Sequence, residues 1–168
     1  MWKIAFICVS LLSCTLGKEE EERAVCFPGF QEINGICYYF SAQGEEISWH
    51  GARDTCINYG GDLAAMGISC TDDVAFMQEM VLRGITKTWI GASDLAVPGT
   101  FRWVDGRNVD HYYQSWFPEQ PQNTLYNCIF MEKTVLNERM YMHSGLCSNP
   151  HSYICAVSLT TNKKNNHT

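Results

Sequence analysis

Apolar residues recur every three or four positions between residues 48 and 59, and this spacing predicts an amphipathic helix. Ser48 can cap the start of this helix, because a serine hydroxyl accepts hydrogen bonds from free amides in the first turn. Gly60 and Gly61 can end it, because glycine tolerates the left-handed conformation that follows many helices. The buried face is predicted to contain Trp49, Ala52, Cys56 and Tyr59.

A second apolar stripe predicts another helix shortly afterwards. This helix is expected to open at Thr71, Asp72 and Asp73, because carboxylates are favoured at the positive end of the helix dipole. Gly84 is expected to stop it. The buried stripe is predicted to contain Val74, Met77, Met80 and Val81.

Short runs of strand-forming residues lie before and after the two helices. Residues 37–40 are predicted to form a strand, with residues 26–36 making a hairpin before it. Later strands are expected at residues 88–92, 101–104, 127–131 and 152–157. The stretch between residues 105 and 128 is long, aromatic and irregular. Two early helices followed by several strands indicate an α+β domain and not a repeated βαβ unit.

The first 17 residues are predicted to be a secretory signal peptide, the alternative being a buried N-terminal strand or helix. Lys3 supplies a positive charge, residues 4–12 are apolar, and small residues precede Lys18. No later stretch reaches the ~18 apolar residues of a transmembrane helix. We therefore expect a secreted, extracellular protein with an acidic leader at residues 18–25, one domain at 26–157 and a polar tail at 158–168.

Seven of the nine cysteines lie outside the predicted signal peptide. Six of them can form disulfides in an oxidising compartment, but spacing alone does not choose among fifteen possible pairings. Cys70 is left over, either as an intermolecular bridge that joins two chains or as a free thiol. The six are Cys26, Cys37, Cys56, Cys128, Cys147 and Cys155.

Charge and motif content exclude several classes of function. The chain has 12 Lys+Arg against 18 Asp+Glu, and this acidic balance argues against nucleic acid or an anionic membrane as the main partner. Neither His-Glu-x-x-His nor Gly-x-Ser-x-Gly occurs, so we do not expect an enzyme. His143 and His151 have no further ligands at a known zinc spacing.

Several ordered motifs together resemble those of the C-type lectin-like domain family, over about residues 26–157. The resemblance implies an α+β C-type lectin-like fold with two helices, small antiparallel sheets, a long irregular loop and disulfide staples. The motifs are Trp49-x-x-Ala52-x-x-x-Cys56-x-x-x-Gly60-Gly61-x-Leu63, Trp89-Ile90-Gly91-Ala92-x-Asp94, Phe101-x-Trp103-x-Asp105-Gly106, Trp116-x-Pro118, Asn127-Cys128, Cys147 and Tyr153-x-Cys155.

The resemblance also implies a disulfide pairing. Cys56 would pair with Cys155, and Cys128 with Cys147, as the two core bonds. A bond between Cys26 and Cys37 would mark the long form of the domain.

In sugar-binding members of this family, a calcium ion bridges the domain and the sugar, and carboxylates supply much of its coordination. The matching positions here are the motif Gln120-Pro121-Gln122, Tyr126, and the motif Met142-His143-Ser144, and none carries a carboxylate. At a second family site Asp94 is kept, but Pro98 stands where a Glu often sits. We therefore expect no calcium or other cofactor at the usual site.

The altered loop nevertheless offers groups that could bind a ligand directly. Amides and hydroxyls can hydrogen-bond saccharide hydroxyls, and exposed tyrosines can stack on sugar rings; the alternative is a solvated polar loop. Trp116 and Phe117 are expected to fill a core under the loop. The candidate ligand-binding residues are Gln120, Pro121, Gln122, Asn123, Tyr126, Tyr112, Tyr113, His143 and Ser144.

The resemblance implies recognition of a glycan or a microbial-surface polysaccharide in innate defence. The main alternative is a calcium-independent module that binds a protein and has lost sugar binding. A third possibility is a protein on the same fold that contacts ice or mineral.

Overall fold

A computed structural model describes residues 25–66, 70–109, 116–122, 125–135 and 139–159, without the side chains of residues 70–73. The predicted signal peptide, Tyr112, Tyr113 and Asn123 lie outside the described residues, as do nearly all of the leader and tail. The elements are β1 (Gln31–Ile33), β2 (Ile36–Phe40), α1 (Trp49–Asn58), β3 (Asp62–Leu63), α2 (Cys70–Leu82), β4 (Lys87–Ser93), β5 (Arg102–Trp103), β6 (Cys128–Lys133), β7 (Met140–Gly145) and β8 (Ser152–Ser158).

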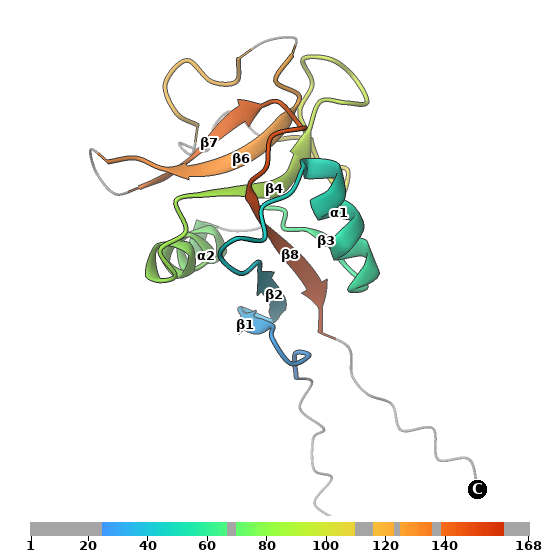
Figure 1. The fold of residues 1–168 in the computed structure, drawn as a ribbon, viewed down its shortest axis with the longest axis vertical. Coiled ribbons are helices and arrows are strands. Elements are labelled where there is room, and N and C mark those ends of the chain that lie inside the picture. The colour runs from blue at the N-terminus through green and yellow to red at the C-terminus, as the bar shows by residue number, and fades with distance from the viewer. Residues whose placement is uncertain (1–24, 67–69, 110–115, 123–124, 136–138, 160–168) are drawn as a thin grey trace, which may run out of the picture.

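The strands form one sheet in the order β1-β2-β8-β4-β6-β7, with β3 added beside β8 and β5 beside β4. Strands β4 and β8 run parallel, whereas the other pairs are antiparallel. The α+β prediction is confirmed, with one parallel pair in place of wholly antiparallel sheets. Figure 1 shows α1 and α2 flanking the central strands, while β6, β7 and the loops at their ends occupy the upper end of the molecule.

Helix α1 begins and packs as its sequence predicts, except at its last position. The Ser48 hydroxyl accepts a hydrogen bond from the Gly51 amide, and Trp49, Ala52 and Cys56 are buried. Tyr59 was predicted to be buried, but it caps the helix and is 40% exposed. Its ring contacts Phe30 at 5.6 Å, outside the main core.

Helix α2 begins at Cys70, one residue before its predicted start. Its core face is built around Phe76 and Met80, which are 3% and 0% exposed. Val74 was predicted to be buried, yet it is 49% exposed, because two positions along a helix turn a side chain far away from Phe76. Met77 and Val81 are partly buried and pack against the core, as predicted.

Two strands were not predicted from the sequence. Strand β3 is only two residues long and pairs with β8. Gly61, which directly precedes it, lets the chain approach β8 closely. A Cβ atom at Gly61 would stand 2.1 Å from the Ala156 carbonyl oxygen, so only glycine fits this approach. Strand β7 alternates buried and half-buried residues between Met140 and Ser144, the pattern of a strand with one face on the core.

The three disulfides implied by the family resemblance are present. Cys56 on α1 is bonded to Cys155 on β8, across 99 positions of the chain. Cys128 at the start of β6 is bonded to Cys147, just beyond β7. Cys26 is bonded to Cys37, which ties the N-terminal hairpin to β2; these bonds fasten the helix, the sheet and the loops together.

Reduction of the disulfides is expected to lower the melting temperature sharply. Closing the loop between Cys56 and Cys155 removes chain entropy from the unfolded state and stabilises the fold by about 4–5 kcal/mol in that treatment. Thermal melts followed by circular dichroism, with and without reductant, test this expectation. An unchanged melt under conditions that free all six thiols would contradict it.

Candidate functional site

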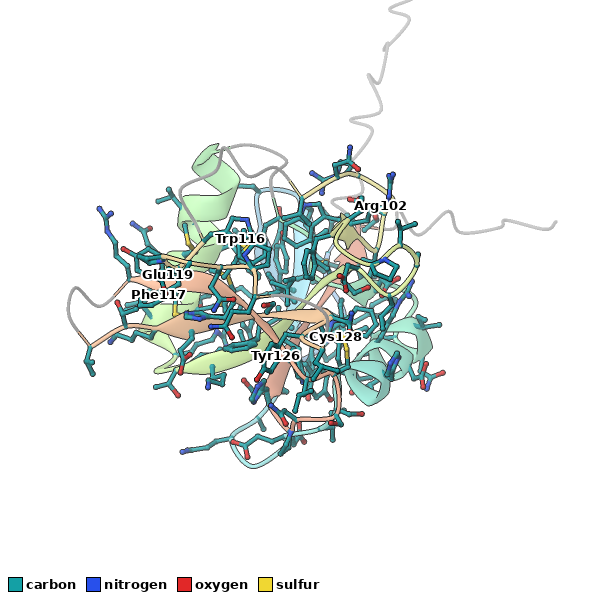
Figure 2. The ribbon with its side chains drawn as sticks, turned by 90° about the horizontal axis from the view of Figure 1, so that it is seen from above. Arg102, Trp116, Phe117, Glu119, Tyr126 and Cys128 are labelled. Carbon is teal, nitrogen blue, oxygen red and sulfur yellow. A yellow bond between two sulfur atoms is a disulfide. The ribbon has the colours of Figure 1, made fainter. Side chains whose placement is uncertain are left out.

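The candidate site lies where three neighbouring strands end. Ser93 at the end of β4 pairs with Cys128 at the start of β6, and Cys128 pairs with Gly145 at the end of β7. The loops that continue from these residues therefore leave the sheet side by side. Figure 2, which views the molecule from above, shows Tyr126 close to Cys128, with Trp116, Phe117 and Glu119 on the adjoining segment.

Gln120 and Ser144 join the long loop to β7 through direct hydrogen bonds. The Gln120 side-chain oxygen accepts from the Ser144 amide and from the Ser144 hydroxyl, each at 3.0 Å. The Ser144 hydroxyl oxygen in turn accepts from the Gln122 amide at 2.8 Å. Pro121 follows Gln120 through a cis peptide bond. The two motifs that the family resemblance matches to calcium ligands are thus hydrogen-bonded to each other here.

Asp94 fastens a second loop to the start of β6. One carboxylate oxygen accepts from the Asn127 side-chain amide and the other from the Gly99 amide, both at 2.7 Å. Asp94 is only 4% exposed, so its carboxylate is directed into the protein. Within the described ranges, no three His, Cys, Asp or Glu residues are grouped so that they could hold a metal ion.

The aromatic residues of the long loop anchor it to the sheet. Trp116 packs partly buried against the main core, with its ring 5.9 Å from Phe101. The Phe117 amide donates to the Met142 carbonyl at 3.1 Å, which holds the loop along β7. Trp116 packs against the core, which confirms the prediction for this residue. Phe117 is half-buried.

The structure divides the predicted ligand-binding residues into two groups. Gln120, Pro121, Gln122 and Ser144 come together at the upper end, and Tyr126 lies in the following segment, 37% exposed. His143 is next to Ser144 on β7, so its side chain points to the opposite face. Cys70 is the first residue of α2, and the structure does not describe its side chain.

His143 stacks between two phenylalanine rings on that opposite face. The ring centres of Phe117 and Phe130 are 4.8 and 5.3 Å away. Burial lowers the pKa of His143 below its usual value of 6.5; the Glu132 carboxylate, 3.9 Å away, opposes this shift and Lys87 reinforces it. The imidazole is therefore a neutral part of the packing at neutral pH.

Sequence reasoning missed the ionic cluster around this histidine. Lys87 on β4 and Glu132 on β6 are direct cross-strand partners, and their charged groups are 3.0 Å apart. The ammonium of Lys87 also lies 4.9 Å from the Phe130 ring centre. His151 contacts the Trp89 ring at 4.5 Å, and burial, reinforced by Lys87, lowers the pKa of His151 as well. The cluster depends on the register between β4 and β6, which the sequence of either strand alone does not determine.

Because both imidazole pKa values are lowered, the protein is expected to lose stability in mild acid. Well above pH 6.5, His143 and His151 are neutral in the folded and unfolded chain and add no pH dependence. Below that pH, the unfolded chain binds protons that the folded chain takes up less readily, so the free energy of unfolding falls. Urea unfolding at pH values from about 7.5 to 5.5 measures this change.

A double variant, His143→Gln with His151→Gln, provides the control for this effect. Its stability should depend less on pH over the same window, because neither glutamine titrates. Equal stability of the parent chain at both ends of the window would contradict the expected effect.

Comparison with known proteins places this architecture in a family. The family model for the lectin C-type domain matches residues 45–157. C-type mannose receptor 2 of Rattus norvegicus is 31% identical over 107 residues, which cover 62% of this chain but only 7% of the receptor. The chain thus spans a small part of this relative's length.

Two further relatives cover more of the chain. The type-2 ice-structuring protein of Brachyopsis segaliensis is 32% identical over 132 residues, covering 79% of this chain and 72% of that protein. The crystal structure of a calcium-independent type II antifreeze protein, 27% identical, superposes with a TM-score of 0.67 and covers 83% of this chain and 99% of that one.

No helix in the described part of the chain is both long and apolar enough to cross a membrane. The matched family model, the disulfide framework and the shared fold agree with one another. The chain belongs to the C-type lectin domain family.

Proposed function

We propose that this protein is a secreted recognition domain that binds a glycan, such as a microbial-surface polysaccharide, without calcium. Membership of the lectin C-type family supports the glycan class, and the candidate site supports the independence from calcium. Recognition on this scaffold needs no chemical step, and we therefore propose no enzymatic activity.

The observation that carries the proposal is the pair of hydrogen bonds from Ser144 to the Gln120 side-chain oxygen. A cation at this position would have to displace both bonds and would meet only neutral ligands from the matching motifs. Calcium affinity depends on the number of charged ligands, and neutral oxygens compensate its dehydration poorly. The loop is held in shape by these bonds instead.

The groups left for a ligand are the exposed ones beside this network. The Gln122 side chain is exposed, and its amide can donate to and accept from saccharide hydroxyls. Tyr126 is 37% exposed and offers a ring face for stacking and a hydroxyl for hydrogen bonding. Asn123, Tyr112 and Tyr113 are proposed to extend this surface from their positions in the sequence.

A glycan array probed with and without EDTA tests the proposal. We expect hits that survive chelation, because no calcium takes part in binding. The variants Gln122→Ala and Tyr126→Ala should each weaken a hit by about fivefold or more, as expected when a hydrogen bond or stacking contact of about 1 kcal/mol is lost. Gln43→Ala, at an exposed glutamine outside the candidate site, is the matched control and should bind as the parent does.

Two kinds of outcome would contradict this function, and the control guards against a false reading. Hits that disappear with EDTA, or a calorimetric calcium affinity tighter than about 1 mM, would restore the cation-dependent mechanism. An array without hits would favour the alternative, a module that binds a protein. A loss of binding in the Gln43→Ala control would show that the readout reports general damage to the fold.

Ice binding is the second candidate, and a specific observation favours it. An ice-structuring protein is 32% identical over most of both chains, and a calcium-independent antifreeze protein shares the fold over 83% of this chain. A measurement of thermal hysteresis decides the point. A freezing-point gap that grows with protein concentration would support ice binding, and its absence at millimolar protein would reject it.

A further inference from the structure

Four aromatic rings in mutual contact lie at the N-terminal end of the domain, away from the long loop. The Phe30 ring centre is 5.5 Å from that of Tyr39 and 5.6 Å from that of Tyr59. The Tyr39 and Tyr59 ring centres are 5.2 Å apart, and Phe27 extends the group from Phe30 at 6.5 Å. These distances join the four rings, which we call the aromatic platform, into one continuous group.

Three segments of the chain build the aromatic platform. Phe27 and Phe30 form a turn before β1, Tyr39 lies on β2, and Tyr59 caps α1. Phe27 is 55% exposed and Tyr59 is 40% exposed, whereas Phe30 and Tyr39 are half-buried. Figure 1 shows β1 and β2 at the lower end of the molecule, opposite the loops at its upper end. The platform therefore offers aromatic surface to solvent at a place separate from the candidate site.

A carboxylate is fixed beside the aromatic platform. The Glu45 Oε2 atom accepts hydrogen bonds from the Tyr39 hydroxyl and from the Ala42 amide, both at 3.1 Å. Burial raises the pKa of Tyr39, and so does the hydrogen bond to Glu45, so this hydroxyl stays protonated and keeps donating. The Glu45 side chain is exposed, and no described residue donates to its Oε1 atom. That oxygen can therefore accept a hydrogen bond from a ligand.

The charges around the aromatic platform favour a cationic ligand. Residues 25–52 contain three glutamates and neither Lys nor Arg. The next cation along the chain, Arg53, is paired with Asp62 at 3.0 Å. An ammonium group is attracted both by a carboxylate and by the face of an aromatic ring, whereas an anion is repelled by both. Sugars that carry a carboxylate or a sulfate are therefore excluded as ligands of this surface.

An amino sugar carries both of the groups that this surface recognises. A pyranose ring has C–H groups that pack on an aromatic face, and polar groups on its rim that bond to a carboxylate. When one rim group is a protonated amine, its contact with Glu45 becomes a charge-assisted hydrogen bond. We propose that the aromatic platform and Glu45 form a second saccharide site, which takes a sugar with a free amine and stacks it on Tyr59. Such a site is independent of the long loop and does not rest on the proposed function.

Two sugar trimers with the same backbone test this second site on the full chain. One is a β-1,4-linked trimer of glucosamine with free amines, and the other is its fully N-acetylated form, which carries no charge. Both are titrated by calorimetry at about pH 6, which keeps the amines protonated, and about 0.15 M salt, which screens distant charges. The free-amine trimer should bind about tenfold more tightly, because only its ammonium groups pair with the carboxylate and the ring faces.

Substitutions locate the binding on the molecule. Glu45→Gln keeps the oxygen that accepts from Tyr39 and removes only the charge, so the two trimers should then bind within about twofold of each other. Glu46→Gln is the matched control, because this neighbouring acid is exposed and its charge acts on His151; it should keep the preference for the free amine. Tyr59→Leu keeps apolar volume but removes the ring face, so it should weaken both trimers by about fivefold. Thermal melts of each variant check that the fold is retained.

Several outcomes would overturn the second site and leave the proposed function intact. These are equal affinity for the two trimers, no binding of the free-amine trimer into the millimolar range, and a preference that persists in Glu45→Gln. Loss of free-amine binding in Gln122→Ala would also overturn it, because the sugar would then occupy the long loop. A tri-lysine peptide that binds as tightly as the free-amine trimer would overturn the saccharide assignment and indicate a site for basic peptides. Array hits that disappear with EDTA would instead overturn the proposed function and leave the second site unaffected.

Discussion

The bond between Cys56 and Cys155 is the constraint on which the rest of the structure depends. It holds α1 against β8, and β8 pairs with β2 along one edge and with β3 and β4 along the other. Gly61 lies against the Ala156 carbonyl at the same junction, where no larger residue fits. Once β8 and β4 are fixed, β6 and β7 can add in sequence along the free edge of β4.

The candidate site is a consequence of that order of strands. The aligned ends of β4, β6 and β7 place three loops beside one another, and the bond between Cys128 and Cys147 closes the second of these ends onto the third. The long loop then needs only to be fastened down. Trp116 attaches the loop by packing against the core, and Gln120 attaches it by accepting hydrogen bonds from Ser144.

Helix caps and the buried faces of helices could be predicted from the sequence, because they depend on neighbouring residues. The helix cap at Ser48 and the buried positions Trp49, Ala52 and Cys56 follow from spacing and side-chain type, and they are confirmed. Tyr59 and Val74 were misplaced because periodicity finds an apolar stripe but not the exact direction of the core.

What could not be predicted depends on contacts between distant residues. Local pattern does not predict strand β7, because its buried positions (Met140, Met142 and Ser144) and its half-buried ones (Tyr141 and His143) do not alternate cleanly between apolar and polar residues. The pair of Lys87 with Glu132 arises from strand register, which the sequence of either strand does not specify. The bonds between Gln120 and Ser144 require a fold in which the two segments meet, so the sequence identifies the lack of carboxylates but not the hydrogen bonds between these positions.

The proposed calcium-independent mechanism separates two tasks that a shared cation would perform together. In a cation-dependent lectin site the same ion shapes the loop and contacts the sugar, so both depend on its occupancy. Here buried Asp94, half-buried Gln120 and the aromatic anchor Trp116 shape the loops from within the protein. In the proposed mechanism the outward-facing side chains have no role in coordination. The exposed Gln122 amide can then face a ligand, because hydrogen bonds and packing within the protein hold the loop.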